Sequence, residues 1–135
     1  MESLIRNTKQ IKQAIDFTKV QNGKIHPTDI DAVLEFDNEA LILIEVKSYK
    51  KCLLPKGQRL VLERIVDSWH TQKAIVLLVE HYFENEDENI PLHLCKVKSF
   101  YHGKTWREDE NKTSLVKCLN ELGRNWQIKK LRFEA

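Results

Sequence analysis

The apolar run Ala40 to Ile44 constrains the fold of this chain more than any other segment. Its length is typical of a buried strand, and the chain leaves it through Glu45, Val46 and Lys47. Side chains two positions apart on a strand share a face, so Glu45 and Lys47 point together while Val46 points away. We therefore expect a buried strand whose end aims a carboxylate and an ammonium group in one direction.

A second strand-like segment, from Asp31 to Phe36, precedes this run, and the turn Asp37-Asn38-Glu39 separates the two. A hairpin centred on Asn38 would set Asp31 directly across from Glu45. Side chains opposed in this way have Cβ atoms roughly 4.5–5.5 Å apart, and two like charges at that distance repel. The pattern therefore predicts a positive group between two carboxylates.

A divalent metal ion is the positive group that this arrangement favours. Proteins hold Mg²⁺ through one or two carboxylates, and water completes its octahedron. Asp31 and Glu45 would supply the carboxylates, and the main-chain carbonyl of Val46 a further oxygen. Lys47 could orient or deprotonate a water molecule and offset charge on a phosphate, so the residues favour phosphodiester hydrolysis. Asp29, across from Lys47, is the alternative to Asp31 as the principal metal ligand.

The remaining patterns predict an α/β fold, a mixed sheet flanked by helices. The expected order is helix, strand, strand, helix, strand, strand, helix, with a short strand or loop at Trp106 after a turn at 102–104. Thr113 is the expected cap of the last helix. The elements besides the hairpin are expected at 3–17, 58–70, 73–79, 92–101 and 113–126.

Length and composition favour one globular domain spanning residues 1–135, with 41% apolar and 31% charged residues. The longest apolar stretches are too short to span a bilayer, and no secretory signal follows Met1, so we expect a cytoplasmic protein that does not enter membranes. Three widely spaced cysteines form no zinc pattern. A net charge of only +2 means that any contact with nucleic acid depends on local basic patches.

The chain resembles the PD-(D/E)xK nuclease superfamily in Pro27-Thr28-Asp29-Ile30-Asp31 followed by Glu45-Val46-Lys47. The resemblance implies a restriction-endonuclease-like αβββαβ core, here with an added C-terminal strand and helix. It implies that Asp31 and Glu45 bind Mg²⁺, for which Mn²⁺ substitutes, and that Lys47 assists the attacking water. The expected substrate is DNA, and the expected activity is that of an endonuclease similar to small phage-type nucleases, junction resolvases or restriction endonucleases. An origin in a phage, with the protein acting inside the host cell, is one option.

Further residues join this expectation. Some branches of the superfamily carry a glutamine in the helix after the lysine strand, and Gln58 fits that position; its alternative role is a solvent-facing residue at a helix start. Lys56 and Arg59 could contact backbone phosphates, and His26 lies beside the motif as a candidate substrate contact. Three aromatic residues could stack on bases: Tyr49, Tyr101 and Trp106.

Two alternatives stay open. The same fold could serve as a catalytically silent nucleic-acid-binding or interaction subunit, and the chain could be a small interaction protein with a solvated surface of mixed charge. The preferred DNA structure, the choice between endonuclease and exonuclease action, and the biological pathway have no marker in the sequence. A homodimer is compatible with the sequence, because many nucleases pair two sites to cut both strands.

Overall fold

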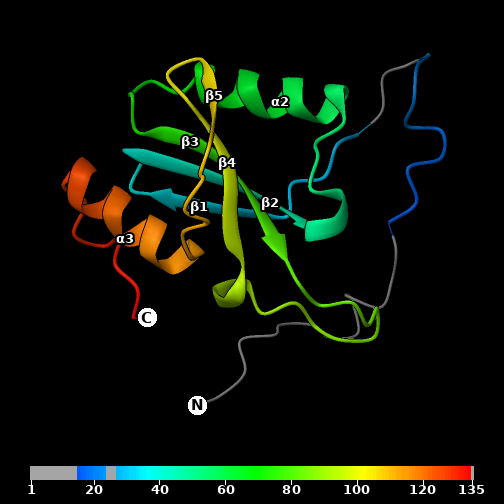
Figure 1. Ribbon diagram of the computed structural model, residues 1–135. Coiled ribbons are helices and arrows are strands. Elements are labelled where there is room, and N and C mark those ends of the chain that lie inside the picture. Colours follow the sequence, from blue (N-terminus) through cyan, green and yellow to red (C-terminus); the bar gives the residue numbers. More distant parts are fainter. Residues whose placement is uncertain (1–14, 24–26, 135) are drawn as a thin grey trace.

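The five strands form one mixed sheet in the order β1-β2-β3-β4-β5 in this computed structural model, which describes residues 15–23 and 27–134 (Figure 1). Strands β2 and β3 run parallel, and the other neighbours are antiparallel. The strands are β1 (Ala32–Phe36), β2 (Ala40–Ser48), β3 (Ala74–His81), β4 (Lys96–His102) and β5 (Thr105–Glu108). The helices are α2 (Lys56–Asp67) and α3 (Leu115–Trp126), with short 3₁₀ turns η1 (Tyr49–Lys51) and η2 (Leu92–Leu94).

The sheet is covered on both faces, which explains why its central strands are almost continuously apolar. Helix α2 connects the parallel strands β2 and β3 and lies on one face, and α3 lies on the other (Figure 1). Alternate residues of β2 therefore enter two separate cores. Leu41 and Leu43 pack with Leu62 and Val66 of α2. The opposite core holds Ile42, Ile44, Leu115 and Leu119.

The general α/β prediction is confirmed, with several local differences. The segment 92–94 forms η2 rather than the first part of a strand, and Pro91 stands at the N-cap position of this turn. Ser114, not Thr113, caps α3, because its side chain accepts a hydrogen bond from the Lys117 N–H. Most of the helix expected at 3–17 lies outside the described residues, and 15–17 are not helical.

A restriction-endonuclease-like core would have three strands before α2, and the described residues contain two strands there, β1 and β2. Within the described ranges, no helix has both the length and the apolar character that crossing a bilayer requires.

The C-terminal segment folds back onto α3 at a glycine that has no room for a side chain. A Cβ at Gly123 would collide with the main-chain carbonyl oxygen of Leu131. The Ile128 N–H donates to the Gly123 carbonyl at 2.9 Å, and Asn120 bonds the main chain of Phe133 through both its amide atoms. These contacts hold residues 128–133 against α3.

We expect Gly123→Ala to lower the free energy of unfolding by about 2 kcal/mol, because the tail must move away from the new methyl group. Urea denaturation measures the change. Gly57→Ala is the matched control: a Cβ there meets open space inside α2, so stability should stay the same or rise by up to about 1 kcal/mol. Equal stability of the Gly123→Ala variant and the wild type would contradict the expectation.

Candidate active site

The β1–β2 hairpin brings the two predicted carboxylates together. Ala32 pairs with Ile44 in the register, so the preceding residue Asp31 stands across from Glu45, as the sequence predicted. The Asp31 N–H donates a hydrogen bond to Glu45 Oε1 at 3.2 Å, and the N–H of the next residue of β2, Val46, donates to Asp31 Oδ2 at 2.8 Å. The main chain thus holds both carboxylates in place.

Gln58 completes this arrangement from the first turns of α2. Its Nε2 donates to Glu45 Oε2 at 3.0 Å and lies 3.5 Å from the Asp29 carbonyl oxygen. The Gln58 side chain therefore faces the carboxylate pair, and its hydrogen bond holds one oxygen of Glu45 in place. Among the described contacts, Asp29 meets this site through its main chain, whereas Asp31 meets it through its carboxylate. The geometry thus favours Asp31 over the alternative Asp29.

Glu45 is an acid in an unfavourable place for a charge. It is only 1% exposed, and its side chain lies on the α2 side of the sheet, where the apolar run of β2 ends. Burial raises the pKa of Glu45 to about 7, and the negative charge of Asp31 contributes to the rise, although Lys47 acts in the opposite direction. The pair therefore holds more negative charge than its protein surroundings balance, and a bound cation would relieve this.

Lys47 follows Glu45 on the same face of β2, in register with Glu80 of β3. Burial favours a neutral Glu80, but hydrogen bonds from Lys112 and Tyr82 hold the pKa of this carboxyl below its ordinary value. Glu80 is thus already balanced by Lys112. This leaves the Lys47 ammonium group available beside Glu45.

The donor set fits a magnesium ion. A strand residue points its N–H and C=O to the same side, so the Val46 carbonyl faces the β1 side, next to the Asp31 carboxylate that its N–H binds. Two carboxylates and one carbonyl match the few protein ligands that Mg²⁺ takes. Within residues 15–23 and 27–134, no three or more His, Cys, Asp or Glu side chains are grouped to hold a metal. Water and substrate oxygens would therefore supply the remaining ligands.

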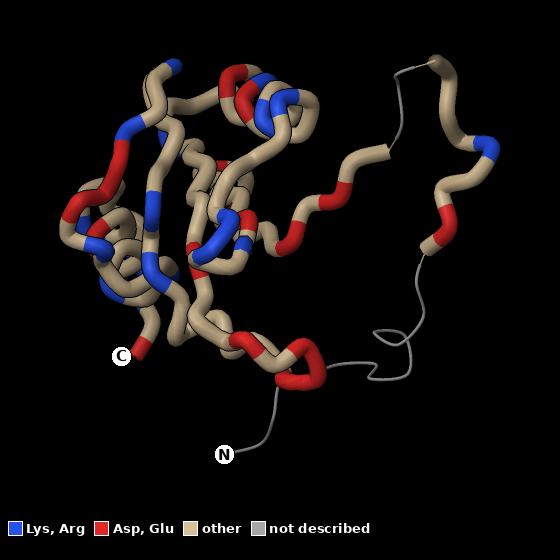
Figure 2. Tube along the Cα trace, turned by 45° about the vertical axis from the view of Figure 1, so that its right-hand side comes forward, with Lys and Arg blue, Asp and Glu red and all other residues tan. Residues whose placement is uncertain are grey.

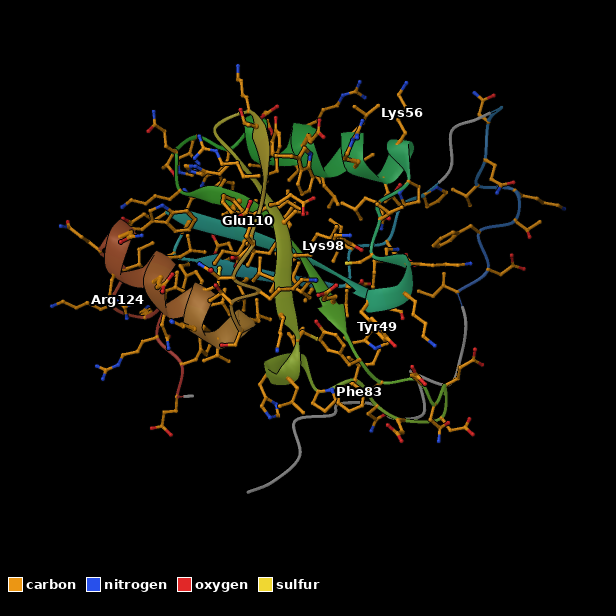
Figure 3. The ribbon with its side chains drawn as sticks, viewed as in Figure 1. Tyr49, Lys56, Phe83, Lys98, Glu110 and Arg124 are labelled. Carbon is orange, nitrogen blue, oxygen red and sulfur yellow. The ribbon has the colours of Figure 1, made fainter. Side chains whose placement is uncertain are left out.

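The other candidates are less closely tied to the carboxylate pair. Lys56 stands at the first turn of α2 and its side chain points away from the sheet (Figure 3). Arg59 lies one turn further on and pairs with Glu63, with 3.3 Å between Nε and Oε2. His26 lies outside the described residues, so its role stays a prediction.

Of the three proposed stacking residues, one prediction is wrong. Tyr101 is 5% exposed and belongs to the core under α2. Tyr49 is 40% exposed and stacks on Tyr82 with 5.0 Å between ring centroids. Trp106 is half-buried at the sheet edge. Trp106 is therefore the aromatic residue that the sheet brings to the α2 face near Arg59.

Sequence reasoning missed Lys98, which lies on β4, next to the edge strand β5 (Figure 3). Its Nζ donates to the Cys52 carbonyl oxygen at 3.1 Å, across from β4 to the segment that follows η1. The pairing of β3 with β4 shifts at Leu78 and Val79, and Lys98 is the residue left without a register partner there. An alternating pattern in the sequence carries no sign of such a shift.

Charge is unevenly distributed over the fold. Basic residues lie along β4 and cluster at η1 and α2, whereas the run from Glu84 to Glu88 forms an acidic loop after the C-terminal end of β3 (Figure 2). This loop contacts η1, because Glu84 Oε1 accepts a hydrogen bond from the Tyr49 hydroxyl and lies 3.1 Å from Lys50 Nζ. Comparison with known proteins finds no matching family model, no similar curated protein and no similar solved structure.

Proposed function

We propose that the chain is a magnesium-dependent DNA nuclease, of the endonuclease kind, with a PD-(D/E)xK-type site. The observation that carries the proposal is the pairing of the buried Glu45, whose pKa is raised to about 7, with the exposed Asp31 across the hairpin, and Lys47 follows Glu45 on the same face of β2. Two carboxylates that can hold a metal ion, with an amine nearby, suit metal-dependent hydrolysis of a phosphodiester. The order of β1, β2, α2 and β3 supports the same proposal.

Each residue has a defined task in this proposal. Asp31, Glu45 and the Val46 carbonyl would hold the ion, and Gln58 keeps Glu45 in the required rotamer. A bound Mg²⁺ would lower the pKa of a coordinated water and offset charge on the phosphate. Lys47 would either take the water proton as a neutral amine, or orient the water and offset the negative charge on the phosphate oxygens as an ammonium ion.

Helix α2 adds a further feature suited to phosphate. Its N-terminus has no side-chain cap at Pro55 and no acidic residue in its first turn. The first N–H groups of the helix and its positive dipole end therefore remain available to an anion near Gln58.

The test is a cleavage assay on purified protein with linear, nicked, flap and junction DNA. We expect products with Mg²⁺ or Mn²⁺ and none with EDTA, and restored activity when Mg²⁺ is returned in excess. The same assay on RNA of matched sequence defines the substrate class. A protein that cuts none of the DNA forms with either metal would contradict the proposal.

A catalytically silent DNA-binding subunit is the second candidate, because the described residues contain no group of three or more His, Cys, Asp or Glu side chains that could hold a metal ion. The Asp31→Asn, Glu45→Gln double variant separates the two. A silent binder would yield no metal-dependent product in either form and would bind DNA as well as before. A nuclease should lose its product in the double variant.

A further inference from the structure

One row of residues crosses the sheet from the carboxylate pair on the α2 side. Glu45 pairs with Leu78 of β3, Leu78 with Ser99 of β4, and Ser99 with Glu108 of β5. Neighbouring strands lie about 4.8 Å apart, so Ser99 is roughly 10 Å from Glu45 along this row. Whatever lies over Leu78 and Ser99 is therefore adjacent to the proposed reaction centre.

A cleft of about 310 Å³ lies over this row, between α2 and strands β4 and β5. Its size is at the lower end of the range for small-ligand pockets in proteins. Its lining contains apolar residues, three cationic residues and one acidic residue. The lining residues are Cys52, Leu53, Leu54, Arg59, Leu78, Lys98, Ser99, Trp106, Arg107 and Glu108.

The aromatic wall of the cleft is held in place from behind. The Trp106 Nε1 donates to Glu63 Oε2 at 2.7 Å, and its ring lies 5.5 Å from that of Tyr101. The Tyr101 hydroxyl in turn lies 3.0 Å from each carboxylate oxygen of Asp67. Glu63 thus holds Trp106 directly, and Asp67 holds it through Tyr101. A ring that is already held in place loses little side-chain entropy when a flat partner binds to it.

Two cations flank this wall. The Arg59 Nε shares the same Glu63 oxygen with Trp106, so the guanidinium and the indole are anchored together. Lys98 uses one donor on the Cys52 carbonyl. Among the described contacts, the terminal nitrogens of Arg59 and the remaining Lys98 protons have no other partner, so they can bind phosphate oxygens. Glu108 is the acidic residue in the lining.

We propose that this cleft binds one unpaired nucleotide of the DNA strand cut at Asp31 and Glu45, so that the substrate is single-stranded DNA. The base lies on Trp106, and Arg59 and Lys98 hold the flanking phosphates. A base inside a duplex has both faces covered by its neighbours, so only an unpaired base can present its ring to Trp106. This inference rests on the proposed nuclease function and adds the form of DNA that it takes.

Binding of a fluorescein-labelled 12-mer oligothymidylate, measured by anisotropy with Ca²⁺ in place of Mg²⁺, tests the cleft. The same strand annealed to its complement is the duplex probe. We expect the single strand to bind at least about 10-fold more tightly. Trp106→Leu should weaken single-strand binding about 10-fold, while Trp106→Phe should stay within about 3-fold of the wild type. Both variants lose the hydrogen bond to Glu63, so the difference between them isolates the aromatic face.

Lys98→Ala provides a second measurement that does not alter the aromatic wall. It should reduce the slope of log affinity against log salt by about 0.7, the value for one phosphate contact on a single strand. Lys117→Ala, an exposed lysine on α3, is the control of equal charge change and should leave the slope unchanged.

The outcomes separate the two proposals. Duplex binding as tight as single-strand binding, or equal affinities for the Leu and Phe variants, would overturn the cleft assignment even if DNA is cut. Single-strand binding that depends on Trp106, in a protein that cuts no DNA with Mg²⁺, would support the cleft and overturn the nuclease proposal alone.

Discussion

Lys47→Ala is expected to lower the rate of DNA cleavage by about 1,000-fold or more at saturating Mg²⁺, with the fold intact. Lys47 lies on the same face of β2 as Glu45 and is half-buried, and Glu80 in its row is already balanced by Lys112. Lys47 can take the water proton as a neutral amine, or orient the water and offset charge near the phosphate as an ammonium ion, and either role is worth about 100-fold or more. Single-turnover cleavage of a labelled DNA measures the effect.

Two controls give this result its meaning. Lys129→Ala removes an equally positive charge from an exposed position in the segment after α3 and should cut at the wild-type rate. Lys47→Arg keeps the charge but cannot release a proton near neutral pH, so it distinguishes charge stabilisation from proton transfer. Wild-type cleavage by Lys47→Ala, with an unchanged circular dichroism spectrum, would remove Lys47 from the mechanism.

The hairpin was predictable because its two constraints act at short range. The turn at Asp37 and Asn38, both with positive φ, fixes the register, and the alternation of β2 fixes the faces. Together the turn and the alternation predict, from the sequence alone, that Asp31 lies opposite Glu45. Strand β3, which runs parallel to β2, was predictable from its continuous apolar run, because such a run is typical of a strand that is covered on both faces.

The cleft was not predictable, because its parts come together through long-range contacts. Trp106, Glu63 and Tyr101 belong to three different elements, and no local pattern links them. The contact of Lys98 with Cys52 depends on a register shift that the sequence does not mark. The buried state of Glu45 was equally hidden, since an acid at the end of an apolar strand is as often solvated as enclosed.

The stability of the metal-free protein is expected to fall as the pH rises from about 4.5 to about 7, through the titration of Glu45. Its folded pKa of about 7 lies above the ordinary value of 4.5, because burial and Asp31 disfavour the charge. The folded state therefore binds more protons than the unfolded state in this window. The loss amounts to about 3 kcal/mol at most, since each pKa unit is worth about 1.4 kcal/mol.

Urea denaturation of the wild type and of Glu45→Gln, at pH 5 and pH 7.5 in EDTA, measures this. Other carboxyl groups with lowered pKa values, such as Glu80 and Glu84, make the free energy of unfolding rise with pH. They are present in both proteins, so their contributions cancel in the difference. The variant should therefore lack the loss that the wild type shows. Mg²⁺ at pH 7.5 should stabilise the wild type and leave Glu45→Gln nearly unchanged, because only the charged pair attracts the ion. Parallel pH profiles for the two proteins would mean that Glu45 keeps an ordinary pKa, and the raised pKa would then no longer support the proposed metal site.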